Sequence, residues 1–189
     1  PLVHRPGDSA QVDFFEVTVE EDGVVRKAWK LLVRLMHSGW DFVHLYDRCD
    51  QLSFLDGHVR AFAYFGGIPQ RMVYDNLSAA IKRRAGMLHG RELTDAFRAL
   101  VSYYLFEPCF ARPGEGHDKG GVESRGKGIR LAHLTPVPRG ANLESISSSV
   151  MADIEALAQS KPRRDGKTTA ELFEADKAAL NPLPARPYD

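Results

Sequence analysis

Cysteine is scarce in this chain of 189 residues, and the two that occur, Cys49 and Cys109, stand far apart in the sequence. Neither belongs to a CxxC pair or has histidines at the spacing of a zinc site. The seven histidines are scattered along the chain and supply no such spacing either. The sequence therefore argues against a disulfide scaffold and a zinc module, and it predicts two free, buried thiols.

Long apolar runs are also missing. No stretch approaches the length that a bilayer span needs, and the start lacks the basic-then-apolar pattern of a signal peptide. These absences predict a cytoplasmic protein without a membrane partner. Because the first residue is proline and the opening residues read like the interior of a protein, we expect the chain to be a fragment of a longer one.

The chain has no net charge, since 25 Lys and Arg residues balance 25 Asp and Glu residues. A protein coated in basic residues is therefore not expected. The distribution is uneven, however: residues 1–25 carry one Arg and six acids, whereas residues 112–139 carry six Lys or Arg and three acids. An acidic centre flanked by basic stretches fits a metal site that binds a polyanion, although solvated charge on helix faces explains most single runs.

Hydrophobic residues make up 43% of the chain, which is enough for one ordinary globular core. We expect this core in residues 1–160. Residues 161–189 begin with a basic stretch and end rich in proline, and Thr168 with Glu171 forms a capping-box pattern that predicts a short helix between them. They are predicted to be a linker to a missing C-terminal domain.

The order of the hydrophobic patterns predicts an α/β fold. Alternation in residues 11–19, a turn at Asp22-Gly23, and apolar residues in 24–36 and 40–46 predict three antiparallel strands. A helix after them implies that the next strand pairs in parallel. We expect a mixed five-stranded sheet, three strands antiparallel and then two parallel, flanked by helices. The later elements are a helix over 52–63, a strand over 71–74, a basic loop over 82–90, a helix over 93–104, a strand over 105–110, a helix that carries Glu123, and a helix over 143–157.

Three carboxylates stand out because of where these elements place them. Asp13 shares a strand face with apolar residues, where an ionised side chain is costly unless a positive charge compensates it. Asp75 directly follows a predicted buried strand, and Glu123 lies one turn into a helix. Acidic residues on two strands and one helix are what a protein needs to hold divalent metal ions for phosphoryl transfer.

Each carboxylate also has a plainer interpretation. The strand end around Asp13 can be exposed to water or paired with an arginine. Asp75 and the following Asn76 are ordinary residues where a strand ends and a turn begins. Glu123 can form weak surface ion pairs with lysines four residues to either side, at 119 and 127.

The stretch before Glu123 has two glycines, Gly120 and Gly121, in the first turn of the predicted helix, at a cost of about 1 kcal/mol each relative to alanine. Close approach of DNA or of a neighbouring strand would explain the bare backbone. His117 fits three roles: a residue at the helix start, a loop histidine bonded to the backbone, or a contributor to the site. Asn76, His117, Gly120 and Gly121 are therefore possible support for the site. The candidate phosphate contacts, although exposed basic faces are the default for such residues, are Arg83, Arg84, Lys119, Lys127 and Arg130.

Several motifs together resemble one known family. They are Gln11-Val12-Asp13-Phe14, Ser53-Phe54-Leu55-Asp56-Gly57-His58, Phe65-Gly66-Gly67-Ile68-Pro69, Val73-Tyr74-Asp75-Asn76-Leu77, Tyr104-Leu105-Phe106-Glu107-Pro108 and His117-Asp118-Lys119-Gly120-Gly121-Val122-Glu123. In this combination they resemble the catalytic domain of IstA-type insertion-sequence transposases, relatives of retroviral integrases with the ribonuclease H-like fold. After Glu123 the chain is richer in glycine than the family's usual continuation.

The resemblance implies that Asp13, Asp75 and Glu123 form a DDE triad that holds two Mg²⁺ or Mn²⁺ ions. Such a triad cuts DNA and joins the freed 3′ end to target DNA. The implied partners are DNA, as element ends and target, a homo-oligomer of the chain, and a helper ATPase of the IstB kind. The family also leads us to expect an N-terminal helix-turn-helix region and a C-terminal small β-barrel outside the chain.

Two other functions stay open. A ribonuclease H-like nuclease, such as a junction resolvase, would use the same carboxylates but stop at hydrolysis. A non-catalytic module for DNA binding or assembly would keep the fold without needing the acids.

Overall fold

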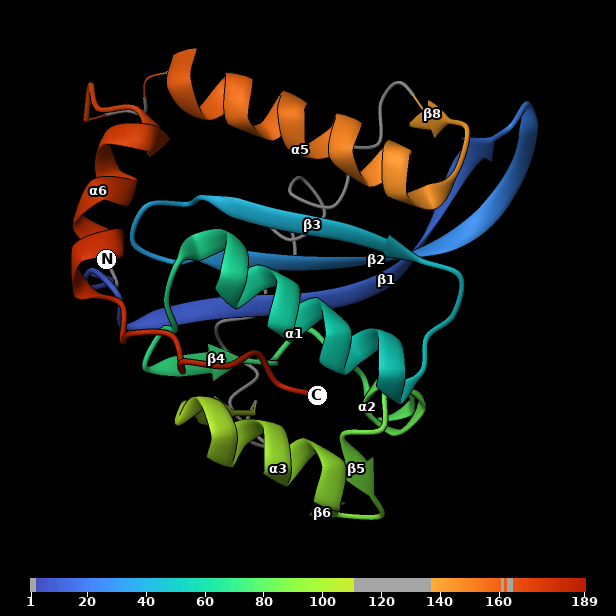
Figure 1. The fold of residues 1–189 in the computed structure, drawn as a ribbon, viewed down its shortest axis with the longest axis horizontal. Coiled ribbons are helices and arrows are strands. Elements are labelled where there is room, and N and C mark those ends of the chain that lie inside the picture. The colour runs from blue at the N-terminus through green and yellow to red at the C-terminus, as the bar shows by residue number, and fades with distance from the viewer. Residues whose placement is uncertain (1–2, 111–136, 161, 163–164) are drawn as a thin grey trace, which may run out of the picture.

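A computed structural model of the chain describes residues 3–110, 137–160, 162 and 165–189. One twisted sheet forms its centre, and helices cover both faces of that sheet (Figure 1). None of the helices within these ranges is long and apolar enough to cross a membrane. The α/β class and the mixed, helix-flanked sheet that the sequence predicts are confirmed.

Three antiparallel strands form the first half of the sheet: β1 (Ser9–Glu21), β2 (Val24–Leu35) and β3 (Asp41–Tyr46). The predicted turn joins β1 to β2, and both of its residues have positive φ, 50° at Asp22 and 79° at Gly23. Alternation makes one face of β1 pack against the helix α1 and the opposite face pack against α5. Asp13 belongs to the second of these faces.

Two short parallel strands, β4 (Arg71–Val73) and β7 (Glu107–Cys109), extend the sheet on the other side of β1. The resulting order is β3-β2-β1-β4-β7. A sixth strand, β8 (Arg139–Gly140), pairs in parallel with the far end of β1, so the sheet has one strand more than predicted. A strand of two residues carries no alternation, which is why the sequence pattern misses it.

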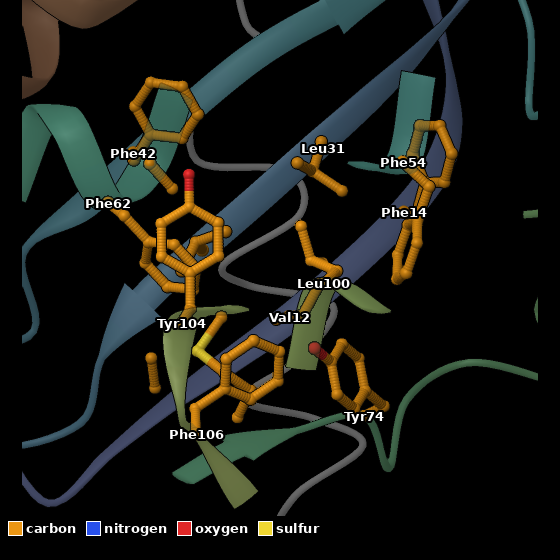
Figure 2. Packing of buried hydrophobic residues seen from close by; sticks show 14 of the residues in the cluster. Val12, Phe14, Leu31, Phe42, Phe54, Phe62, Tyr74, Leu100, Tyr104 and Phe106 are labelled. Atoms are coloured by element: carbon orange, nitrogen blue, oxygen red, sulfur yellow. The ribbon is translucent and has the colours of Figure 1, made fainter. Parts of the chain in front are cut away.

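The helix α1 (Gln51–Phe65) begins where the side chain of Asp50 accepts a hydrogen bond from the Ser53 amide, at 2.9 Å. It ends at Gly66, whose φ of 74° gives the left-handed C-cap. Together with α3 (Asp95–Tyr104), α1 covers one sheet face, and Figure 2 shows the aromatic side chains that fill this core. The labelled residues there include Phe14, Phe54, Phe62, Tyr74 and Phe106.

The segment predicted as a basic loop over 82–90 is more ordered than expected. It contains the second half of α2 (Ala79–Arg84), which Ser78 caps, and then β5 (Leu88–His89), which forms a hairpin with β6 (Glu92–Leu93) just after the segment. Ala85 and Met87 are fully buried and anchor this segment on the core. The predicted strand over 105–110 starts two residues later, because Leu105 takes a φ of 59° as the C-cap of α3.

The helix α5 (Leu143–Ser160) covers the second face of the sheet. Its buried side chains Ile146, Val150 and Ile154 form a cluster with Val17 and Val43 of the strands. Both cysteines are free thiols; Cys49 is buried as predicted, whereas Cys109 is half-buried at the end of the edge strand β7.

The last helix, α6 (Thr169–Ala179), has the predicted capping box of Thr168 and Glu171. The residues after it return to the core, where Asn181 pairs with Ile68 and the Tyr188 ring lies 5.4 Å from that of Tyr103. Residues 165–189 therefore pack against the core instead of leading away from it. A further domain beyond them stays a prediction.

Candidate metal centre

Asp13 lies near the middle of β1 and is only 5% exposed. Its cross-strand partner on β2 is Leu32, which is also buried. Val17 and Val19 lie four and six residues further along β1 on the same face, and both are buried in the cluster with α5. The structure thus confirms that Asp13 is a largely buried carboxylate on the strand face that also carries Val17 and Val19.

Asp75 comes two residues after the last residue of β4, in the turn that leaves the sheet. The parallel register of β1 with β4 pairs Gln11 with Val73, where β4 ends. Asp13 comes two residues after Gln11 on β1, and Asp75 comes two residues after Val73 in the turn. The Gln11 side chain links the two strands directly, because its Nε2 donates a hydrogen bond to Asp75 Oδ1 at 3.1 Å. Asp75 is exposed, whereas Asp13 is buried.

The backbone before Asp75 is held from inside the core. The Tyr74 hydroxyl lies 2.8 Å from His58 Nε2, and His58 Nδ1 lies 2.7 Å from the Phe54 carbonyl oxygen. Since a carbonyl only accepts, Nδ1 carries the proton and Nε2 accepts from the Tyr74 hydroxyl. Burial lowers the pKa of His58 to about 4, so the ring stays neutral. Figure 2 shows Tyr74 within this core cluster.

Lys30 is a charged residue of this region that the sequence reasoning missed. It lies on β2 between Phe15 and Leu45, on the same sheet face as Asp13, and is 1% exposed. Burial lowers its pKa to about 8, while the carboxylates of Asp41 and Asp13 oppose that shift. If the alternation of β1 is continued through the hairpin onto β2, it predicts that Lys30 lies on the same sheet face as Asp13.

The third predicted carboxylate, Glu123, lies outside the described residues. The same holds for the supporting residues His117, Gly120 and Gly121 and for the basic residues Lys119, Lys127 and Arg130. Among the residues with described positions, no three His, Cys, Asp or Glu side chains gather closely enough to hold a metal ion. The described part of the candidate site thus consists of Asp13 on β1 and Asp75 in the turn after β4.

The other predicted contacts lie close to Asp75 in the sequence. Asn76 is half-buried in the same turn, and Arg83 and Arg84 are exposed at the end of α2. The Arg84 guanidinium lies 4.8 Å from the centroid of the Trp29 ring, a cation–π geometry that already uses one of its faces. Support of the site by Asn76 and DNA binding by Arg83 and Arg84 stay predictions.

Sequence comparison connects the whole chain with transposases. It is 31% identical over 190 residues to a transposase of Aminobacter aminovorans, covering 100% of this chain and 37% of that protein. A transposase for the insertion sequences IS1326/IS1353 of Pseudomonas aeruginosa is 29% identical over 97% of this chain and 36% of its own length. The transposase of IS21 from the same organism is 28% identical over 98% of this chain and 47% of its own length. The chain thus spans between about a third and a half of these relatives, and no protein-family model matches it.

Structure comparison gives the fold. The catalytic core domain of HTLV-2 integrase, solved with magnesium in a dimeric form, superposes with a TM-score of 0.60 at 16% identity. The match covers 89% of this chain and 97% of that domain, so the fold is ribonuclease H-like, as predicted. The chain is thus homologous along nearly its whole length to IS21-family insertion-sequence transposases, and its integrase-core fold is consistent with the IstA type.

Proposed function

We propose that the chain is a transposase catalytic domain that cuts DNA and joins the freed 3′ end to target DNA, with divalent metal ions held by Asp13, Asp75 and Glu123. The observation that carries the proposal is the register of β1 and β4. Asp13 and Asp75 each come two residues after the last register pair, Gln11 with Val73, and the Gln11 side chain on β1 donates a hydrogen bond to Asp75, which supports their convergence. The remaining support is the homology to transposases.

The residues present fit a magnesium or manganese site. Carboxylate oxygens are the ligands that Mg²⁺ prefers, and it is usually held by one or two carboxylates together with water and substrate phosphate. Asp13 is buried and Asp75 is exposed, so the two carboxylates would provide one buried ligand and one accessible ligand. When bound, two such ions would activate the attacking hydroxyl and neutralise the leaving oxygen.

The chain's own residues hold and orient the carboxylates for an in-line displacement. A hydroxyl oxygen attacks the phosphorus, the bond from phosphorus to the 3′ oxygen breaks, and that oxygen leaves with a proton as a 3′-OH. Water as attacker cuts the strand, and the freed 3′-OH as attacker joins it to target DNA without a covalent enzyme intermediate. The low exposure of Asp13 keeps its charge in a medium of low permittivity, where interaction with a cation is strong.

The partners that follow are DNA, further copies of the chain and a helper ATPase of the IstB kind. Two DNA ends must be brought together for insertion, which favours a multimer. Integrase cores of the same fold have been solved in dimeric and trimeric forms. The setting that fits is the bacterial cytoplasm, where the nucleoid supplies both element and target.

Amide variants of the three carboxylates test the proposal. With supercoiled plasmid and a 3′-OH oligonucleotide as substrates and Mg²⁺ or Mn²⁺ present, the protein should nick the plasmid and join the oligonucleotide to it. Asp13→Asn, Asp75→Asn and Glu123→Gln should each lower both rates by at least roughly a hundred-fold, because each removes a charged metal ligand. Asp95→Asn, which changes an exposed carboxylate on α3, is the matched control and should leave the rates unchanged.

The outcome also separates the alternatives. Metal-dependent nicking without any joining would favour a nuclease that only hydrolyses. DNA binding that needs none of the three carboxylates, without nicking or joining, would favour an assembly module. Full activity of any one amide variant would show that this residue is not a ligand.

A further inference from the structure

Lys30 is a buried lysine that the proposed reaction does not use. Its residue is 1% exposed, and within the described part of the chain its Nζ has no hydrogen-bond partner. Nζ lies 5.7 Å from the centroid of the Phe15 ring. A buried ammonium group is costly unless opposite charge compensates it, and this burial also excludes a direct contact with DNA.

The strand register places Lys30 diagonally beside Asp13. Lys30 pairs with Phe15, and Asp13 is the next residue along β1 on the same face. Diagonal neighbours on antiparallel strands lie about 7–8 Å apart, which is within the reach of a lysine side chain. The Asp13 carboxylate accordingly favours the charged form of Lys30, second to that of Asp41.

Arg34 and Asp41 are two further charged residues on this sheet face, and they form an ion pair with each other. Arg34 donates from Nε and Nη2 to the two carboxylate oxygens of Asp41, both at 2.6 Å. The carboxylates of Asp41 and Asp13 both favour the charged form of Lys30, whereas Arg34 disfavours it. Lys30 and Arg34 thus carry two positive charges close to the carboxylates of Asp41 and Asp13, and a divalent ion bound at Asp13 would add two more positive charges close to Lys30.

We propose that Lys30 is a positioning residue for Asp13: its charge holds the Asp13 carboxylate in place while no metal ion is bound, and it keeps the affinity of that carboxylate for divalent cations low. The proposal rests on the proposed function, because it takes Asp13 to be a metal ligand. A site tuned in this way binds metal weakly by itself. It gains affinity when the phosphates of DNA add negative charge.

The neutral variant Lys30→Met gives the sharpest test. At constant pH near neutrality, Mn²⁺ binding to the protein is measured by the electron paramagnetic resonance signal of free Mn²⁺ and by the rise in Tm with Mn²⁺. Removing a positive charge beside the ion should lower the Kd for Mn²⁺ roughly ten-fold and enlarge the rise in Tm. The double variant Lys30→Met with Asp13→Asn should bind Mn²⁺ as weakly as Asp13→Asn alone.

A matched control is available on the same strand. Lys27 is exposed, its Nζ donates to Thr18 Oγ1 at 2.9 Å, and it lies further from Asp13 along β2. Lys27→Met should therefore leave the Kd for Mn²⁺ unchanged. A similar fall in Kd for both lysine variants would attribute the effect to net charge and would overturn the role of Lys30.

Failure of the two proposals can be told apart. If Asp13→Asn loses Mn²⁺ binding but Lys30→Met binds no more tightly than the wild type, Lys30 has no such role while Asp13 remains a ligand. If Asp13→Asn binds Mn²⁺ like the wild type, the metal site itself is wrong and the proposal for Lys30 falls with it. Lys30→Leu serves as a second variant, and failure of both to fold would overturn the proposal by showing that the core needs the ammonium group.

Discussion

The buried hydrogen-bond chain of His58 and Tyr74 makes the stability of the protein depend on pH. The pKa of His58 is lowered by burial to about 4 in the folded protein, against 6.5 for an exposed histidine. Between these two values the unfolded chain binds a proton that the folded chain does not. The contribution is therefore complete above pH 6.5 and is lost as the pH falls through 4.

We expect the free energy of unfolding to fall by about 3 kcal/mol between pH 7 and pH 4 on account of His58 alone. The double variant His58→Phe with Tyr74→Phe removes both partners of the hydrogen bond and leaves no buried polar group unpaired. Urea unfolding at the two pH values should show a smaller acid loss for this variant by that amount. The exposed-site variant His89→Gln should behave like the wild type, and an equal acid loss in all three proteins would contradict the assignment.

Among single residues, the sequence identifies Asp13 more readily than Lys30. Asp13 interrupts an alternating apolar face within one strand, so its burial can be predicted from its own neighbours. The face of Lys30 depends on the register between β1 and β2, which pairs it with Phe15. The proximity of Lys30 to the carboxylates of Asp41 and Asp13 is a tertiary property, and only the structure reveals it.

At the level of elements, the contact of α1 with the sheet depends on a glycine. A Cβ atom on Gly57 would lie 1.9 Å from Leu31 Cδ2 and 3.2 Å from Leu31 Cγ, and Leu31 is fully buried on β2. Alanine here would improve the intrinsic helix propensity by about 1 kcal/mol. The overlap with β2 opposes this gain.

Gly57→Ala should lower the free energy of unfolding by a net 1–3 kcal/mol, roughly the usual cost of overpacking a core. The measurement is chemical denaturation of Gly57→Ala, Leu31→Ala and the double variant. Because Leu31→Ala vacates the space that the new methyl group needs, the double variant should lose less stability than the two single losses added together. Strict additivity would mean that Gly57 and Leu31 are not in steric conflict.

The elements that the sequence predicts well are those long enough to show a period. The three antiparallel strands and the helices α1, α3 and α5 all fall within a few residues of their predicted bounds. By contrast, β5, β6 and β8 have two residues each, and the six residues of α2 do not complete two turns. Their formation depends on tertiary contacts such as the burial of Ala85 and Met87.

At the level of the whole molecule, the C-terminal segment joins parts of the chain that are far apart in sequence. Its composition predicts a linker, because proline and basic residues are typical of one. The structure instead packs it against Gly67, where a Cβ atom would lie 2.7 Å from Leu180 Cβ. The composition of a segment describes that segment only. The contact of Leu180 depends on the missing side chain of Gly67, which lies more than a hundred residues earlier in the sequence.

Asp176 is the central contact of this arrangement. It is 1% exposed on α6, its Oδ1 accepts from the Gly7 amide at 2.8 Å, and its Oδ2 accepts from the Ser38 amide at 3.0 Å. One carboxylate thus holds the start of the chain, the turn between β2 and β3, and the last helix. Both oxygens are needed, because each amide can only donate.

Asp176→Asn keeps the shape of the side chain but replaces one acceptor oxygen by a nitrogen that only donates. One of the two backbone amides then faces another donor in a buried site, which should cost about 2–3 kcal/mol in the free energy of unfolding. Guanidinium unfolding measures that loss, and brief trypsin digestion of the folded protein should cut faster at Lys167 and Lys177 as α6 loosens. Glu174→Gln, which changes an exposed carboxylate on the same helix, should alter neither quantity. If Asp176→Asn were as stable and as resistant to trypsin as the wild type, the C-terminal segment would be held without Asp176, by the pairing of Asn181 with Ile68 and by Phe173 on Trp40 and Tyr188 on Tyr103.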